Sequence, residues 1–501
     1  MKKIVLNTLL GALVFLSSCK KDEVVVYSAP SVSAPSAVTS LTAGEAGKVT
    51  FTVAVDPKLT ANYTATGTNV TVTNATGAVS GSNVEVNFTT SADGAGAVKL
   101  TVTDSKGNIS VATAVISIGK VITEVRVTSN ITTNTTWDAK KVWILGGRIA
   151  VTSGATLTIE PGTIIKGEAG AGASATALIV ARGGKVNAAG TATKPIIFTS
   201  VADKLSIADV AAGKFASPNL APDVNGLWGG LIILGKAKIS ASVSGTTTQK
   251  TEVQIEGIPT SDPNGLYGGS DDADNSGVYK FISVRHGGTE IGAGNEINGI
   301  TLGGVGSGTV FENIEVVGNQ DDGIEWFGGT VNGKNIVVWG AGDDGLDTDQ
   351  AFRGTITNFA IISVGGSSFE LDGPEGTYGL DLSGHTFDKG FVNVSGSAGS
   401  FIDNDDNTAV TLKNIYATGF STTAFTQNIT EVFTSPYKTT AGVKFENIVM
   451  NVASADLAKY IDKSTGKTIP STITAGNTIT GGADLTQFAG WSWTAIAEKL
   501  K

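Results

Sequence analysis

Alternating hydrophobic and polar positions dominate the first part of the chain. Segments such as 49–55 and 84–88 place an apolar residue at every second position, as half-buried β-strands do. Clusters of Gly, Asn, Asp and Ser separate these segments, and the turn at 104–108 lies between two alternating runs, which is typical of a hairpin. The spacing of these strands predicts an immunoglobulin-like β-sandwich over residues 38–119.

A second pattern begins near residue 120 and repeats at a nearly fixed period. The segment from Asn313 to Glu325 recurs from Asn335 to Asp347, and then in weaker form from Asn358 to Glu370. Such self-similarity indicates a solenoid in which each copy forms one coil. The inward apolar positions are predicted to be Ile300, Ile324, Leu346, Phe369, Phe401 and Phe425. The column of structural asparagines at one turn is predicted to be Asn313, Asn335, Asn358 and Asn414.

Composition and charge narrow the class of protein. Glycine accounts for 65 of the 501 residues and only 16% of residues are charged, which favours a turn-rich all-β chain. The net charge of −10 provides no positive surface for nucleic acid or for anionic lipid head groups. The single cysteine excludes a disulfide framework.

The N-terminus predicts export and lipid anchoring. Lys2 and Lys3 precede an apolar run that is too short to span a membrane and ends just before Cys19. The segment Leu16–Cys19 resembles the lipobox of bacterial lipoproteins, and the charged residues 20–23 resemble an export signal of surface lipoproteins in Bacteroidota. We therefore expect a protein held by its N-terminal lipid in the outer membrane and facing the cell exterior.

These patterns divide the chain into five parts. The C-terminal part is expected to be a cap over the last coil, because it is rich in large aromatic residues. The predicted parts are a signal peptide (1–18), a lipidated linker (19–37), the sandwich (38–119), the solenoid (120–483) and the cap (484–501).

Acidic residues recur with the coils. Glu325, Asp347 and Glu370 each follow an inward apolar residue, so strand alternation turns them outward, one coil apart. Neighbouring carboxylates at such spacing repel one another, and a Ca²⁺ ion would relieve the repulsion. Further metal ligands are predicted in two acidic turns and in a separate acidic loop, namely Asp321, Asp322, Asp343 and Asp344, and Asp271, Asp272 and Asp274. The alternative is that these acids cap turns and face water.

Two tryptophans flank the acids. An exposed ring beside carboxylates is typical of a sugar-binding surface. The predicted ligand-binding residues are Glu325, Asp347, Glu370 and Trp339. Trp326 lies two residues after Ile324, which places it on the inward side of the strand and favours a core position.

The repeat region resembles right-handed parallel β-helix proteins of the pectate-lyase-like fold, and more closely a Bacteroidota group of surface β-helix proteins. The residues that carry this resemblance are Gly154–Gly167, Asp274–Tyr279, Asn295–Gly308 and Asp321–Val331. The resemblance implies an all-β chain in which a right-handed parallel β-helix follows the sandwich. It does not imply one chemistry, because lyases, hydrolases and adhesins share the fold.

Two functions remain open at this point. The first is binding of an extracellular ligand such as a polysaccharide, as an accessory to a TonB-dependent outer-membrane transporter. The second is a polysaccharide lyase or glycoside hydrolase acting through Asp322, Asp343, Asp344 and Arg353. The acidic repeats lack the histidine and the Arg-x-Lys motif that accompany such acids in polygalacturonases. We therefore predict a binding protein rather than an enzyme.

Overall fold

The computed structural model describes most of the chain in two compact units. The described residues are 26–36, 39–121, 123–243, 246, 248–292, 295–375, 384–404, 408–430, 442–460 and 469–501. The units divide at Ile122 and Thr123. The predicted signal peptide and Cys19 lie outside the described residues. Within the described part, no helix has the length and apolar character needed to cross a bilayer.

The first unit is a sandwich of two sheets with an apolar interior. Alternating residues of β3 and β7, such as Phe51, Val86 and Phe88, are fully buried between the sheets. In the described residues, the strand order of the first sheet is β1 (Ser31–Ser33), β3 (Ala46–Ala54), β7 (Asn83–Thr90) and β5 (Val70–Val72). That of the second is β2 (Thr39–Thr42), β9 (Ile109–Gly119), β8 (Gly94–Asp104), β4 (Ala61–Thr68) and β6 (Thr76–Ala78).

One boundary differs from the sequence prediction. The segment 31–33 was expected to belong to a linker, but it forms β1 and pairs with β3 of the sandwich. The assignment of this unit to the immunoglobulin-like class stays a prediction.

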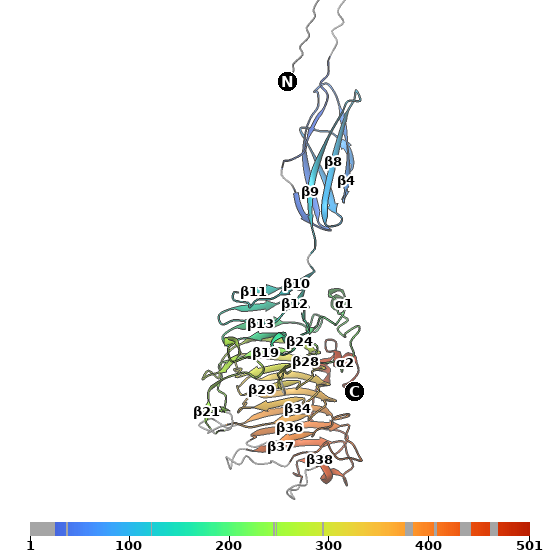
Figure 1. The fold of residues 1–501 in the computed structure, drawn as a ribbon. Coiled ribbons are helices and arrows are strands. Elements are labelled where there is room, and N and C mark those ends of the chain that lie inside the picture. The colour runs from blue at the N-terminus through green and yellow to red at the C-terminus, as the bar shows by residue number, and fades with distance from the viewer. Residues whose placement is uncertain are drawn as a thin grey trace, which may run out of the picture. The chain divides into compact units, whose positions relative to one another are not determined.

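The second unit is a stack of parallel strands (Figure 1). One sheet, of 15 strands in the described residues, runs through β10 (Glu124–Val127), β12 (Val142–Leu145), β15 (Ile164–Gly167), β18 (Ile196–Ser200), β24 (Gly277–Arg285), β28 (Val310–Val317), β30 (Gly333–Trp339), β32 (Thr355–Ile362), β34 (His385–Asn393), β36 (Val410–Thr418), β37 (Val443–Met450) and β38 (Ile473–Ala475). Three further strands pair beside this path, namely β11 (Thr135–Trp137), β14 (Thr156–Ile159) and β17 (Lys185–Ala189).

The facing sheet has eight described strands and carries the acidic residues considered below. Its order is β13 (Arg148–Val151), β16 (Ala177–Val180), β19 (Leu231–Leu234), β27 (Ile300–Gly303), β29 (Ile324–Phe327), β31 (Leu346–Asp349), β33 (Phe369–Leu371) and β35 (Ile402–Asn404). Each strand therefore belongs to one coil of a parallel β-helix, as predicted.

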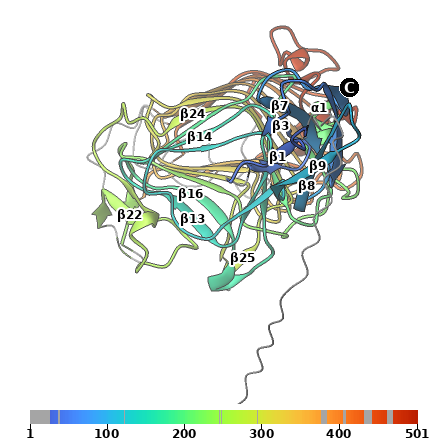
Figure 2. The same cartoon turned by 90° about the horizontal axis from the view of Figure 1, so that it is seen from above.

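Short elements project from the coils. The paired strands are β20 (Ala241–Ser242) with β21 (Gln249–Lys250), β22 (Glu252–Gln254) with β23 (Leu266–Gly268), and β25 (Glu290–Gly292) with β26 (Asn295–Glu296). The helices are α1 (Ile207–Ala211) and α2 (Trp493–Ile496), with short 3-10 turns at η1 (Gly172–Ser174), η2 (Pro263–Gly265), η3 (Leu457–Tyr460) and η4 (Leu485–Phe488). Seen from above, β22 lies outside the stack of coils (Figure 2).

The interior of the β-helix is a column of apolar side chains. Ile300, Ile324, Leu346 and Phe369 pair in register and are fully buried, as predicted. The register then continues to Ile402 rather than to Phe401, and Ile402 bridges to Ile429 rather than to Phe425. Burying each such side chain stabilises the fold by about 1.5–3 kcal/mol.

The asparagine column is confirmed. Asn313, Asn335 and Asn358 have left-handed backbone angles, with φ of 58°, 57° and 61°. Their side chains form a ladder, because Nδ2 of Asn335 donates to Oδ1 of Asn313 (2.9 Å) and Nδ2 of Asn358 donates to Oδ1 of Asn335 (2.7 Å). Asn tolerates this backbone region better than most residues, and its amide links consecutive turns.

The C-terminal segment does not cap the last coil. Phe488, Trp491 and Trp493 pack on the outer face of the 15-stranded sheet, against residues such as Val337 and Ile362. Figure 1 shows α2 at the level of β24 and β28, in the middle of the stack, and not at the end of the stack where β37 and β38 lie. The reason is that an apolar stripe on the outside of the middle coils provides a larger hydrophobic partner for these rings.

Candidate functional site: an acidic cluster on the eight-stranded sheet

The predicted acidic ladder exists and is longer than expected. Glu325 pairs with Asp347 across β29 and β31, and Asp347 pairs with Glu370 across β31 and β33. The same column continues to Asp403 on β35. Asp403 is not predicted from the sequence, because the spacing of the repeats places Phe401, and not Ile402, in the inward column.

A second polar column lies at the turn that precedes these strands. The register places Asn298, Asp322, Asp344 and Ser367 at equivalent positions of successive coils. Oδ1 of Asp322 accepts the backbone N–H of Asp344 at 2.8 Å, and Oδ1 of Asp344 accepts that of Ser367. These two aspartates therefore satisfy backbone donors of the next coil, which is the turn-capping alternative considered from the sequence.

The two columns converge into one cluster. Carboxylate oxygens of Asp322, Glu325 and Asp347 all lie within 4.8 Å of one another, and so do those of Asp321, Asp322 and Asp343. Asp343 is exposed, whereas Asp322, Glu325 and Asp347 are only 7–8% exposed. We name the set of Asp322, Glu325, Asp344, Asp347 and Glu370 the acidic cluster.

The burial of this cluster was not predicted. Its side chains leave the outer face of the sheet, as alternation requires, but Ser240 and Tyr267 lie over that face. The Tyr267 ring packs 6.1 Å from that of Phe327, and its hydroxyl donates to Oε1 of Gln350 at 2.9 Å. The backbone N–H of Ser240 also donates to the carbonyl of Gln350. This cover comes from a distant segment, which local alternation cannot reveal.

Burial and the neighbouring carboxylates raise the pKa values of Asp322, Glu325, Asp344 and Asp347. Burial first, and the neighbouring carboxylates second, raise the pKa values of Asp322, Glu325 and Asp347 well above the ordinary range. For Asp344, burial and a hydrogen bond to Glu370 raise the pKa to about 10. Burial also raises the pKa of the adjacent Asp349 to about 8.

A buried amide adds a further polar group to the cluster. Asn298 is 1% exposed, and its Nδ2 donates to Oε2 of Glu325 at 2.5 Å. The Oδ1 atom of the same side chain has no hydrogen-bond partner among the described residues. Within these residues, none of the five carboxylates of the cluster forms an ion pair with lysine or arginine. The cluster therefore combines uncompensated acids with an unused carbonyl oxygen.

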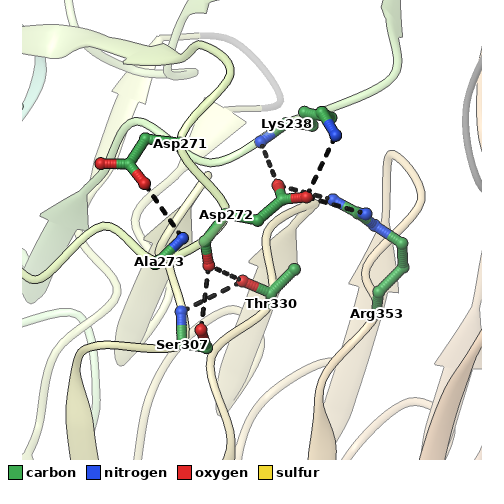
Figure 3. A network of polar contacts seen from close by, with 7 residues as sticks. All are labelled: Lys238, Asp271, Asp272, Ala273, Ser307, Thr330 and Arg353. Atoms are coloured by element: carbon green, nitrogen blue, oxygen red, sulfur yellow. Dashed lines mark hydrogen bonds and ion pairs between the residues drawn. The ribbon is translucent and has the colours of Figure 1, made fainter.

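The separate acidic loop at 271–274 plays a different role (Figure 3). The carboxylate of Asp272 accepts two hydrogen bonds from Arg353, at 3.0 and 3.2 Å, and others from the backbone and ammonium of Lys238. Its backbone carbonyl accepts from Ser307 and Thr330 of two successive turns. Asp272 thus links several coils. Because its carboxylate is engaged by Lys238 and Arg353, it is not available as a calcium ligand in this loop.

Arg353 is also not available to act as a catalytic base. It is held by Asp272, and its side chain is only 10% exposed. The two histidines do not replace it, since His286 and His385 are buried and burial lowers both pKa values, that of His385 to about 3. His385 lies against Thr348 and the ring of Phe352 inside the coil.

The aromatic residues do not form a sugar platform beside the acids. Trp339 is 7% exposed and is covered by the C-terminal segment, with its ring 5.9 Å from that of Trp493. The proposed ligand-binding role of Trp339 is therefore corrected to a packing role. Trp326 is a core residue, as predicted, and stacks on Phe352 at 5.5 Å.

The fold and the site define an all-β protein whose parallel β-helix carries a buried acidic cluster on one sheet. A family model described as a pectate-lyase-like β-helix domain matches residues 129–494, and the chain belongs to this family. No curated protein matches the chain. Among solved structures, the chain is similar to the catalytic unit of a thermostable GH87 α-1,3-glucanase from Streptomyces thermodiastaticus strain HF3-3. That similarity has 10% identity and a TM-score of 0.21, over 89% of this chain and 90% of the other. It carries no argument about activity.

Proposed function

We propose that this chain is a lipid-anchored, cell-surface binding protein whose β-helix holds a Ca²⁺ ion at the acidic cluster. The ligand that we propose is an extracellular polysaccharide. The observation that carries the proposal is the convergence of three buried carboxylates, those of Asp322, Glu325 and Asp347, within 4.8 Å without a basic partner in the described residues. Like charges at such distances repel strongly in a poorly solvated site.

The donor set suits a hard divalent cation. Ca²⁺ prefers six to eight oxygen ligands, and three carboxylates binding through both oxygens supply up to six. The Oδ1 atom of Asn298 is a neutral oxygen beside Glu325 and would complete the set. Ca²⁺ binding would release the protons that the cluster otherwise shares, so affinity is expected to rise with pH.

Binding is favoured over catalysis because the groups that catalysis needs are engaged elsewhere. Arg353 is paired with Asp272, and both histidines are buried with lowered pKa values. Asp322 and Asp344 accept backbone N–H groups, which gives them a structural task.

The proposed location at the cell surface depends on the N-terminal sequence alone. Lys2, Lys3 and the apolar run before Cys19 support export followed by lipid attachment. We further propose that the anchored protein delivers its ligand to a TonB-dependent outer-membrane transporter. Co-purification from the membrane, with the Cys19→Ala variant as control, tests both statements. Release of that variant from the membrane supports the anchor, and membrane retention contradicts it.

Calcium binding is tested by calorimetry on the purified mature chain. We expect the wild type to bind Ca²⁺ and the Glu325→Gln/Asp347→Asn double variant to lose at least tenfold in affinity. Glu446→Gln is the matched control, because Glu446 is half-exposed on a different face and pairs with Lys413. Wild-type protein that binds no Ca²⁺ at pH 8, or a double variant that binds as tightly, removes the metal from the proposal.

Polysaccharide binding is tested by affinity electrophoresis in gels that contain acidic or neutral polysaccharides. The wild type should be retarded in at least one gel, and the proposal of a glycan ligand fails if none retards it.

One observation favours a glycoside hydrolase as the second candidate. Asp344 keeps its proton at neutral pH and lies next to the exposed Asp343, and an acid beside a second carboxyl group is what glycoside hydrolysis requires. Incubation with the same polysaccharides, followed by assay of reducing and unsaturated ends, tests this candidate. Product that disappears in Asp344→Asn would establish catalysis and overturn the binding proposal.

A further inference from the structure

A polar groove lies apart from the acidic cluster, between two coil turns and the segment that projects beside them. Its volume is about 450 Å³, within the range of small-molecule sites. We name it the Lys236 groove, and its lining residues are Ser153, Arg182, Lys236, Glu252, Gly268, Gly269, Ser270 and Asp271.

The lining combines hydrogen-bond donors and acceptors in equal measure. Arg182 uses Nη1 to donate to Oε1 of Glu252 at 2.6 Å and to the carbonyl of Gly268 at 2.7 Å. The Nε and Nη2 atoms of Arg182 have no partner within the described part of the chain, and its side chain is 23% exposed. Two cationic and two anionic side chains therefore face one space, and three guanidinium N–H groups remain for a ligand.

Ser153 and Lys236 form a pair of donors in the groove. A Cβ atom at Gly183 would lie 2.6 Å from Oγ of Ser153 and 3.2 Å from Nζ of Lys236. The hydroxyl and the ammonium thus converge where a glycine, at a φ of 87°, leaves room. Among the described residues, the Lys236 ammonium forms no ion pair.

The groove also has an acceptor. Asp271 is exposed, and Oδ1 accepts the backbone N–H of Ala273 at 3.1 Å. Figure 3 shows the second carboxylate oxygen directed away from the Asp272 junction. Charged oxygens and nitrogens of this kind form hydrogen bonds roughly twice as strong as neutral ones.

The charge balance selects the chemical class of the ligand. An anion would be repelled by Glu252 and Asp271, and a cation would be repelled by Arg182 and Lys236. An apolar ligand would desolvate all four charged groups and would leave Lys236 and Asp271 without a charged partner in the groove. A neutral polyhydroxylated molecule satisfies both signs, because each hydroxyl donates one hydrogen bond and accepts others.

We propose that the Lys236 groove binds a neutral saccharide unit, directly and without a metal ion. That the biological ligand is a glycan rests on the proposed function. Binding in the groove does not require calcium at the acidic cluster. The chain would contact its polysaccharide at two places, one cation-dependent and one not.

The test is calorimetric titration of the full mature chain in EDTA with maltotriose, laminaritriose, cellotriose, mannotriose and trigalacturonate. At least one neutral trisaccharide is expected to bind, and trigalacturonate is expected to bind more weakly. Lys236→Met and Asp271→Asn should each lower the affinity about tenfold, because each removes a charged hydrogen-bonding group. Lys185→Ala is the control, since Lys185 is an exposed lysine on β17 outside the groove.

The outcomes separate the two proposals. Binding that persists in the Glu325→Gln/Asp347→Asn variant supports the groove even where calcium binding has failed. The groove proposal is overturned if no neutral trisaccharide binds, if both groove variants keep wild-type affinity, or if trigalacturonate binds more tightly than the neutral trisaccharides. None of these results affects the calcium test. Thermal unfolding of each variant, unchanged from wild type, shows that the substitutions act on the ligand and not on the fold.

Discussion

Asp344→Asn is expected to stabilise the protein at neutral pH when calcium is chelated. The folded chain keeps Asp344 protonated, whereas the unfolded chain ionises it. Asparagine has nearly the same shape and is always neutral, so it removes this difference. Its Oδ1 can still accept the N–H of Ser367, and its Nδ2 can donate to Glu370 as the protonated acid does.

The magnitude follows from the pKa of Asp344. Burial and Glu370 raise it from an ordinary value of 3.8 to about 10 in the folded state. Between these two pH values the folded chain binds one more proton than the unfolded chain, so stability falls as pH rises. Each pH unit costs about 1.4 kcal/mol, which amounts to about 4 kcal/mol at pH 7. The cost vanishes near pH 4 and stops growing above about pH 10.

Denaturation by guanidinium chloride in EDTA at pH 4, 5.5, 7 and 8.5 measures this effect. All seven tryptophans lie at or beyond Trp137, so their fluorescence reports the β-helix and not the sandwich. Asp223→Asn is the matched control, because Asp223 is exposed. A variant that gains no stability at pH 7, or that gains equally at pH 4, would refute the claim that a retained proton at Asp344 destabilises the fold.

Three further predictions concern the supporting structure and use the same denaturation assay. Arg353→Ala should cost about 2 kcal/mol, because it leaves the carboxylate of Asp272 with Lys238 alone, and a loss below about 0.5 kcal/mol would show that the junction is dispensable. Asn335→Ala should cost about 1 kcal/mol more than Asn335→Gly, since only alanine is strained at a φ of 57°, and equal losses would assign the whole effect to the amide ladder. Trp493→Ala should cost about 3 kcal/mol, whereas the 45%-exposed Ile496→Ala should change little, and similar small losses in both would show that the C-terminal segment is loosely attached.

The repeat in the sequence predicted the register of the acids because stacked coils impose one period on every position. Glu325, Asp347 and Glu370 align as the nearly constant step between copies requires. The register was lost at the next coil, where the step lengthens and Ile402, not Phe401, is the inward residue. Because an insertion changes the number of residues between copies, the position of Asp403 in the column could not be predicted from the sequence.

Exposure was less predictable than register. Alternation predicts on which face of the sheet a side chain lies, and the side chains of Glu325 and Asp347 do lie on the outer face. Their burial depends on residues such as Ser240 and Tyr267. The burial of Trp339 depends on the C-terminal segment, which is far along the chain. The role of Arg353 likewise depends on Asp272, which lies several coils earlier in the sequence. No local pattern contains these contacts.

The sequence by itself determined the all-β class, the coil period, the asparagine ladder and the acidic column. Each of these depends on alternation or repetition along neighbouring residues, and the parallel stack carries that order directly into space. Only the tertiary structure decided that Asp322, Glu325, Asp344 and Asp347 are buried with raised pKa values. It also decided that Asp272 pairs with Arg353 and that the C-terminal segment covers a sheet face. These outcomes depend on which distant segments cover which surface, because burial sets both the electrostatic environment of a carboxylate and the access of a ligand to it.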